Sequence, residues 1–373
     1  MDLTQLLIGL ERLKGSDLYL TADSPPLYRV DGATVEAHPA VLDPLAVETL
    51  ILGTLTPLEL QQLEKTHELN TARTIPKVGR FRLNVFQQRG QIGLVARLIP
   101  IKFPGIAALG LPDILTDIVM QKRGLVFVTG ATGAGKSTTL AALIDHRNQN
   151  SRGHIITIED PIEFVHHHHG CVVTQREVGV DTFSFSSGLK SALRQAPDVV
   201  LIGEIRDREV MEAALHFAET GHLVLGTLHA NNANQAIDRI INFFDVSFHS
   251  QLFTQLSLNL RGIISQRLVA RADGQGRVVA VEVMLNSPRV SDLLSKGDII
   301  SLKGAMEINS QDGSRTFDQA LHELYRAGKI TLDEALRQAD SKNNLRLRIK
   351  MEDAAGFTGE KSGFSIQRDE EAA

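Results

Sequence analysis

The feature that most constrains the fold is a glycine-rich segment about one third of the way along the chain. It fits the pattern G-x-x-x-x-G-K-[ST], directly after the apolar run Leu125–Val128 and directly before the helix-forming run Thr139–Leu143. Backbone N–H groups of such a loop turn inward onto phosphate oxygens, and the helix N-terminus adds a favourable dipole. The chain should therefore contain a strand–loop–helix unit that binds phosphate. The segment reads Gly130-Ala131-Thr132-Gly133-Ala134-Gly135-Lys136-Ser137-Thr138.

Two side chains of this segment have specific expected tasks. Lys136 should reach the β- and γ-phosphates of a nucleotide, and the Ser137 hydroxyl should take one coordination position of Mg²⁺. The expected cofactors are therefore ATP and Mg²⁺. The predicted nucleotide contacts in the loop are Gly130, Thr132, Gly133, Ala134, Gly135, Lys136, Ser137 and Thr138.

Apolar runs of strand length alternate with helical stretches in the rest of the central region. Strands separated by helices imply βαβ units and a mostly parallel sheet that is covered on both faces. The sequence therefore predicts an α/β fold. The candidate strands are Leu125–Val128, Ile155–Ile158, Val199–Ile202 and Leu223–Leu225.

A second, smaller domain is expected before this region, since 373 residues exceed one typical core. Residues 1–99 mix an amphipathic helix with short alternating strands and indicate an α+β domain. The proline- and glycine-bearing stretch 100–112 is the predicted linker, and residues 113–350 form the predicted nucleotide domain. Residues 351–373 are predicted to be an acidic, disordered tail.

Charge and cysteine content argue against several classes of protein and of site. The net charge is −5, and the tail holds six acidic and two basic residues. The remaining chain is therefore close to neutral and offers no basic surface for nucleic acid. Cys171 is the only cysteine, which excludes an internal disulfide and a cysteine-rich zinc site. No apolar run reaches the roughly 18 residues of a membrane span, and the charged N-terminus is unlike a signal peptide. A cytoplasmic protein is expected.

Carboxylates follow two of the candidate strands. Glu204 ends the run Val199–Ile202 after one glycine, and an acidic group from Glu159 to Glu163 ends another strand. At the carboxyl edge of a parallel sheet both would lie beside the phosphate site. One could hold Mg²⁺ through water while the other orients or deprotonates the attacking water.

The histidines do not predict a metal site. His222 and His229 are seven residues apart on an extended segment, more than about 20 Å, so they cannot share a metal ion. The run His166–His169 lacks the carboxylate or thiol spacing of a tetrahedral site and is predicted to be an exposed loop.

Taken together, these motifs resemble the secretion ATPase superfamily of type II, type IV pilus and type IV secretion systems. Within it the chain is similar to the retraction ATPases, the PilT and PilU branch. The resemblance runs from residue 1 to about 350 and implies a RecA-like ATPase domain, a PAS-like N-terminal domain and a homo-hexameric ring. It rests on the motifs above, on Thr157–Glu163 and Thr220–His229, and on Ser16–Leu18, Pro26, Arg29–Gly32, Gln175–Val178 and Ile264–Gln266.

The resemblance also implies roles for single residues. Glu204 would be the Walker B carboxylate that holds Mg²⁺ through water, and Glu163 the acid that activates water. Arg82 and Arg97 would complete a neighbouring subunit's site in trans, because a guanidinium neutralises charge on the transferring phosphoryl group. The remaining implied positions are Glu159 beside the nucleotide, His229 on the γ-phosphate side and His222 at a subunit interface.

Two positions depart from the PilT pattern and are more similar to PilU. Ala196 stands where an acidic residue is usual, and Ser287–Leu294 replaces an Ala-Ile-Arg motif. The expected function is pilus retraction, powered or assisted at the cytoplasmic face of the inner membrane. The expected partners are a membrane platform protein and a paralogous retraction ATPase.

Three other functions remain open. An extension or type II secretion ATPase typically carries a four-cysteine zinc insert and an extra N-terminal domain, and this chain has one cysteine in 373 residues. An accessory ring subunit would not require the Lys136, Ser137 and Glu204 set. A DNA or RNA motor would bind nucleic acid in a salt-dependent manner.

Overall fold

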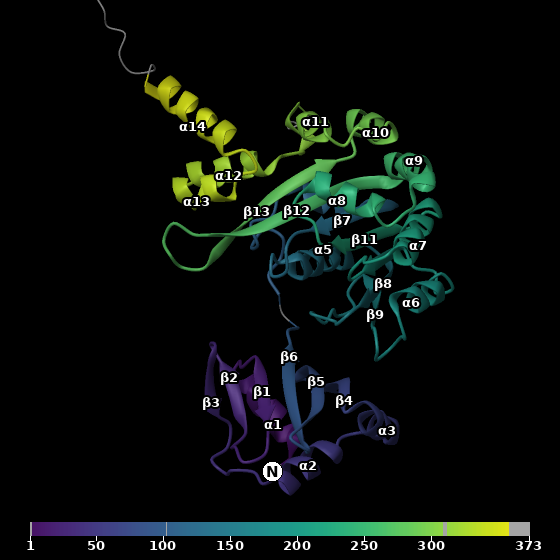
Figure 1. The fold of residues 1–373 in the computed structure, drawn as a ribbon, viewed down its shortest axis with the longest axis vertical. Coiled ribbons are helices and arrows are strands. Elements are labelled where there is room, and N and C mark those ends of the chain that lie inside the picture. Colours follow the sequence, from purple (N-terminus) through teal and green to yellow (C-terminus); the bar gives the residue numbers. More distant parts are fainter. Residues whose placement is uncertain (1, 102, 309–311, 358–373) are drawn as a thin grey trace, which may run out of the picture.

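Two separate β-sheets organise the chain in a computed structural model that describes residues 2–101, 103–308 and 312–357 (Figure 1). The smaller sheet belongs to the N-terminal part and the larger sheet to the central part. A single connection after β6 leads from one to the other. The predicted α/β architecture with a smaller N-terminal domain is confirmed.

The N-terminal sheet is antiparallel, with strand order β3-β2-β1-β6-β5-β4. Its helix α1 begins at the N-cap Asp2 and buries a leucine face, as the spacing of those leucines predicts. Helix α3 begins with a complete capping box between Thr56 and Glu59. The elements are α1 Leu3–Arg12, β1 Asp17–Leu20, β2 Leu27–Val30, β3 Ala33–Glu36, α2 Pro44–Leu52, α3 Pro57–Thr66, β4 Glu68–Ile75, β5 Gly79–Gln88 and β6 Gln91–Ile99.

The larger sheet has the strand order β13-β12-β7-β11-β10-β8-β9, in which only the β12–β13 pair is antiparallel. The carboxyl ends of the parallel strands therefore meet at one edge, where a parallel sheet usually binds its ligand. The strands are β7 Gly124–Thr129, β8 Gly153–Glu159, β9 Cys171–Glu177, β10 Val199–Ile202, β11 Leu223–Leu228, β12 Leu260–Ala270 and β13 Arg277–Leu285.

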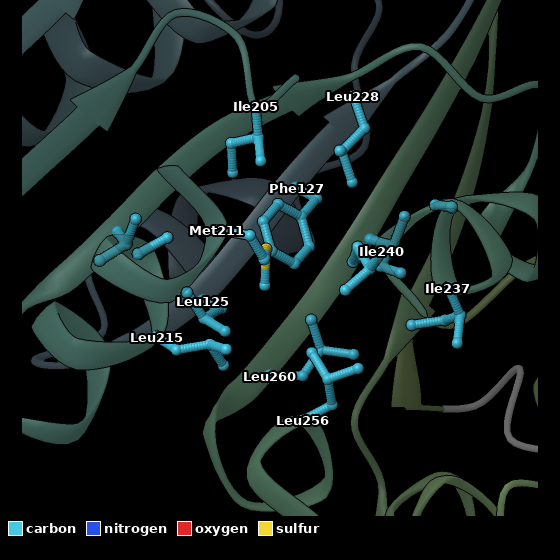
Figure 2. Close-up of a cluster of buried hydrophobic side chains, with 14 of the residues drawn as sticks. Leu125, Phe127, Ile205, Met211, Leu215, Leu228, Ile237, Ile240, Leu256 and Leu260 are labelled. Carbon is cyan, nitrogen blue, oxygen red and sulfur yellow. The ribbon is translucent and has the colours of Figure 1, made fainter. Parts of the chain in front are cut away.

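Alternate residues of β7 enter different cores. Leu125 and Phe127 pack with helices α6 to α11 on one face, while Val126 and Val128 pack with α4 and α5 on the other (Figure 2 shows the first cluster). Burial on both faces explains why the central strands are continuous apolar runs. These helices are α4 Ile114–Val119, α5 Lys136–Asn150, α6 Phe185–Ala192, α7 Arg208–Glu219, α8 Ala233–Ile241, α9 His249–Asn259, α10 Pro288–Ser295 and α11 Leu302–Ile308, with a 3₁₀ turn, η1, at Val246–Phe248.

A third group of helices packs beside the β12–β13 pair (Figure 1). These are α12 Phe317–Arg326, α13 Leu332–Gln338 and α14 Lys342–Phe357. Helix α14 includes residues 351–357, so the prediction of disorder is wrong for this part of the tail. The rest of the predicted tail lies outside the described residues. Within the part of the chain that the structure describes, no helix is long and apolar enough to cross a membrane.

Candidate active site

The glycine-rich loop leaves β7 and turns into α5 against the neighbouring strand β12. Gly130 has φ +153°, and a Cβ at this position would lie 2.7 Å from the carbonyl oxygen of Gln266. Gly135 has φ +90°, and its position as the N-cap of α5 also favours glycine. The loop therefore packs so closely on β12 that a side chain at Gly130 would clash with the backbone.

The start of α5 offers free donors to an anion. Gly135 has no side chain, so the first N–H groups of the helix have no side-chain cap. These N–H groups and the positive end of the helix dipole are suited to phosphate oxygens. Lys136 extends over the loop, and its Nζ donates to the carbonyl oxygens of Gly130 at 2.8 Å and Ala131 at 3.1 Å. Burial lowers the pKa of Lys136, and the charge of Glu204 opposes that change.

Glu204 follows β10 and meets two partners. Its Oε2 accepts from Arg206 at 2.7 Å, and its Oε1 lies 3.2 Å from His229 Nε2. Burial opposes ionisation of Glu204, but the hydrogen bond and charge of Arg206, aided by His229 and Lys136, outweigh burial and lower its pKa. Burial and the charge of Lys136 lower the pKa of His229, although Glu204 acts in the opposite direction. Near neutral pH the pair is thus an ionised carboxylate and a neutral imidazole.

The acidic segment at the end of β8 contains one half-buried and one exposed carboxylate. Glu159 Oε1 accepts from Thr157 Oγ1 at 2.6 Å and Gln175 Nε2 at 3.2 Å. Burial raises the pKa of Glu159 to about 7, against the effect of these hydrogen bonds. Glu163 is exposed in the loop that follows. Of the two, Glu163 is the carboxylate with access to solvent water.

One cavity of about 530 Å³ joins the glycine-rich loop to both carboxylate segments and His229. Four parallel strands, β7, β8, β10 and β11, each contribute the residues at or after their carboxyl ends. The predicted site residues that line the cavity are Thr132, Gly133, Gly135, Lys136, Ser137, Thr138, Glu159, Glu163, Glu204 and His229.

Other predicted residues lie elsewhere in this chain. Gly130 and Ala134 belong to the loop but line a neighbouring cavity of about 630 Å³. His222 lies at the opposite end of β11, where its ring packs against Phe217. An interface role for His222 stays a prediction.

The two predicted arginines lie side by side in the N-terminal domain. Arg82 and Arg97 are paired across strands β5 and β6. Arg97 donates to Asp17 of its own domain at 2.8 Å, and its charge also attracts Glu163 of the same chain. Their action on a neighbouring subunit stays a prediction.

The histidine run is only partly an exposed loop. His167, His168 and His169 are exposed, but His166 packs its ring edge-on to Phe103 and lines the nucleotide cavity. Burial, with the charge of His167, lowers the pKa of His166 to about 4. The prediction of exposure is therefore wrong for His166, because an aromatic residue from the linker covers it.

Sequence reasoning also missed Arg206, which joins the two carboxylate segments. It pairs with Glu204 at 2.7 Å and with Asp160 at 3.9 Å. The signal available in the sequence was its position two residues after Glu204, the carboxylate that follows β10. The cavity is also lined by Thr227, Leu268 and Arg277, from β11, β12 and β13.

The donors present fit Mg²⁺ that arrives with a nucleotide. Ser137 and Glu204 line the same cavity, and Mg²⁺ usually takes one or two protein ligands together with waters and phosphate oxygens. Across residues 2–101, 103–308 and 312–357, no group of three or more His, Cys, Asp or Glu could hold a metal ion. The site thus has the chemistry of a shared protein–nucleotide Mg²⁺ site.

Comparison with known proteins decides the family. Residues 103–355 match the model of the family described as Type II/IV secretion system protein. The chain is 48% identical over 370 residues to the type IV pilus ATPase PilU of Pseudomonas aeruginosa, covering 98% of this chain and 97% of that protein. This chain is a type IV pilus ATPase of the PilT and PilU family. The resemblance inferred from its motifs is confirmed.

Further members and structures agree with this assignment. The retraction ATPase PilT of Pseudomonas aeruginosa is 40% identical over 344 residues, covering 92% of this chain and all of PilT. A crystal structure of the pilus retraction motor PilT with bound ADP matches with a TM-score of 0.85 and 39% identity, over 93% of this chain and 99% of that one. The Legionella pneumophila ATPase DotB matches with a TM-score of 0.70 and 28% identity, over 89% and 94% of the chains. The larger domain of this pilus ATPase is therefore RecA-like.

Proposed function

We propose that this pilus ATPase is the Mg²⁺-dependent subunit of a homo-hexameric ring that powers or assists type IV pilus retraction and so twitching motility. The observation that carries the proposal is the single cavity that collects Lys136, Ser137, Glu163, Glu204 and His229. Similarity to proteins named for pilus retraction supports the direction of work.

The side chains divide the chemistry between them. Lys136 and the free N–H groups of α5 hold the phosphates, and Ser137 and Glu204 would hold Mg²⁺, which supplies charge neutralisation at the β- and γ-phosphates. Glu163 accepts a proton from the attacking water. Neutral His229 donates from Nε2 toward Glu204 and changes partner when the γ-phosphate is present. Arg82 and Arg97 of a neighbouring subunit complete the charge balance.

The setting of this motor is also part of the proposal, supported by similarity to pilus ATPases. The ring works in the cytoplasm against a platform protein of the inner membrane, with a paralogous retraction ATPase as a second partner. The domain limits 1–99, 100–112 and 113–350, with a PAS-like first domain, are part of the proposal. The departures at Ala196 and Ser287–Leu294 support dependence on that paralogue, although α10 forms in this stretch with Ser287 as its N-cap.

A turnover assay tests the chemistry. Glu204→Gln should bind ATP but hydrolyse it about 10²–10³-fold more slowly, because losing one preorganised group that stabilises transition-state charge typically costs this much. Glu209→Gln is a suitable control, since Glu209 pairs with Lys190 on the surface, away from the cavity. Wild-type turnover by Glu204→Gln would show that the site is assigned wrongly.

A deletion strain tests the direction of work. It should keep or accumulate surface pili and lose twitching motility, wholly or under load. A strain without pili that regains them on complementation would indicate an extension motor. Normal pili with normal motility would indicate that the protein is an accessory subunit.

A further inference from the structure

Arg267, on strand β12, makes contacts that the nucleotide chemistry described above does not use. Its guanidinium donates to the backbone oxygen of Asn231 at 3.2 Å, and Asn231 lies two residues after His229. The same guanidinium pairs with Asp340 Oδ1 at 2.7 Å and donates to the backbone oxygen of Gln338. One side chain therefore joins the loop that follows His229 to the turn between α13 and α14.

The residues on either side of Arg267 face the glycine-rich loop and the cavity beside it. Gln266 is 2% exposed, and its Nε2 donates to the backbone oxygen of Ala134 in the glycine-rich loop at 2.7 Å. Leu268 lines the 530 Å³ cavity. Because successive side chains of a strand point to opposite faces, Arg267 points away from that cavity. Arg267 lines the neighbouring cavity of about 630 Å³ beside the glycine-rich loop. It does not line the 530 Å³ cavity with Lys136, Glu204 and His229, so it reaches these groups through other residues.

The loop after His229 is held from the β12–β13 pair at a second point. Glu282 Oε1 on β13 accepts the backbone N–H of Ala233, the first residue of α8, at 2.8 Å. Glu282 is 2% exposed, so this contact is enclosed by protein. The backbone from His229 to Ala233 is thus anchored by Arg267 at Asn231 and by Glu282 at Ala233.

Asp340 connects Arg267 to the C-terminal helices. Lys303 on α11 lies 3.4 Å from Asp340 and 3.5 Å from Asp318 on α12. Asp318 Oδ1 also accepts the backbone N–H of Asp340 at 2.8 Å. The Arg267 guanidinium lies 3.9 Å from the centre of the Phe317 ring, a cation–π contact with α12. Helices α11, α12 and α13 therefore all meet at the Arg267–Asp340 pair.

We infer that Arg267 is a positioning residue that couples the His229 loop to the C-terminal helices. When His229 changes partner at the γ-phosphate, the shift of its loop reaches Asp340 through Arg267 and then α11 through Lys303. Displacement of the C-terminal helices moves His229 by the same route, because coupling between two sites is reciprocal. The inference rests on the proposed role of His229.

A mutant cycle in the full-length protein tests this inference. Arg267→Gln should lower the kcat for ATP about 10-fold, because a displacement of about 1 Å at a catalytic group can cost about 10²-fold in rate and the expected shift is smaller. The affinity for ADP should not change, since the phosphate-binding loop keeps its contacts. In a His229→Ala background the same substitution should lower kcat no further, because residues acting as one unit are not additive. Arg271→Gln is the matched control, since Arg271 pairs with Asp273 just beyond the same strand.

Each outcome of the cycle decides one claim. An additive loss of kcat in the double variant, or no loss from Arg267→Gln alone, would overturn the coupling while leaving the role of His229 intact. Wild-type kcat in His229→Ala alone would overturn the role of His229 and the coupling with it. If Arg267→Gln does not fold, Asp340→Asn replaces it in the cycle. Asp340→Asn removes the charge on the helix side, keeps the Asn231 contact and should lower kcat about 3-fold, again only when His229 is present.

Discussion

The nucleotide cavity has two halves that are supported in different ways. Lys136 begins α5, directly after the glycine-rich loop that leaves β7, and Glu204 and His229 follow the ends of the parallel strands β10 and β11. Glu163 and His166 lie on an irregular loop after β8. The half with Lys136, Glu204 and His229, here called the strand-end half, is therefore fixed by the core. The half with Glu163 and His166, the loop half, depends on what packs against it.

The linker supplies that packing. Phe103 of the linker contacts the rings of Phe164 and His166, and Val165 donates its N–H to the backbone oxygen of Pro100. Farther along the same interface, Arg80 of β5 pairs with buried Glu177 at 3.4 Å. We therefore expect phosphate binding to need the RecA-like domain alone, and the proposed water activation by Glu163 to depend on the linker that packs on its loop.

The largest expected effect is on the strand-end half. Lys136→Ala should lower turnover by at least about 10²–10³-fold, the cost of removing one preorganised partner of a charged transition state. It should also weaken ATP binding, because Lys136 acts in the ground state too. Turnover and equilibrium binding of a labelled nucleotide measure both effects. Lys190→Ala, an exposed lysine paired with Glu209, is the control; equal behaviour of the two variants would contradict the assignment.

A substitution in the loop half should slow catalysis without weakening ATP binding. Glu163→Gln should lower kcat about 10²-fold and leave ATP affinity unchanged, because its carboxylate takes a proton only in the chemical step. Glu212→Gln, whose carboxylate pairs with Arg208 on α7, serves as control. A Glu163→Gln variant that loses ATP affinity but keeps kcat would place Glu163 in the binding half.

Rings assembled from two variants test whether Arg97 of one subunit acts on the loop half of its neighbour's cavity. Arg97→Ala subunits and Lys136→Ala subunits should each be inactive, and an equal mixture should recover up to about a quarter of wild-type activity if the arginine acts in trans. That fraction is the chance that an intact cavity meets a neighbour with an intact Arg97. No recovery in rings shown to be mixed would instead favour action within one chain, where Arg97 already attracts Glu163.

The strand-end half was largely predictable from sequence. Strands β7, β8, β10 and β11 are buried on both faces, so they are apolar runs, and the ends of parallel strands must meet. The two long strands β12 and β13 were not predicted. Polar residues that the tertiary structure buries, Gln266 and Glu282, interrupt their apolar pattern.

Contacts between distant segments account for the other errors. His166 belongs to a run of four histidines, and only the linker residue Phe103, more than sixty residues earlier, shows why it is covered. Arg206 contacts Glu204 because both follow β10, which spacing suggests, but its approach to Asp160 depends on the adjacency of β8 and β10. Side-chain direction and strand order decide such contacts, and a single sequence encodes neither of them locally.

The smallest expected effect concerns Glu159, the carboxylate between the two halves. Its pKa is raised to about 7 by burial, so in the folded nucleotide-free protein it holds its proton over a range in which the unfolded chain has lost it. Above the unfolded pKa the folded state binds more protons, and stability must fall as pH rises until the folded pKa is reached. The loss of stability is at most about 3 kcal/mol, and less where water reaches the carboxyl.

Glu159→Gln, which cannot ionise, should therefore have nearly the wild-type Tm at about pH 4.5 and a higher Tm at about pH 8. Its kcat should fall less than about 10-fold, because Glu163 supplies the base. A Tm difference that does not change with pH would mean that folding does not raise the pKa of Glu159. A kcat loss as large as that of Glu163→Gln would move water activation to the end of the strand and remove the distinction between the halves.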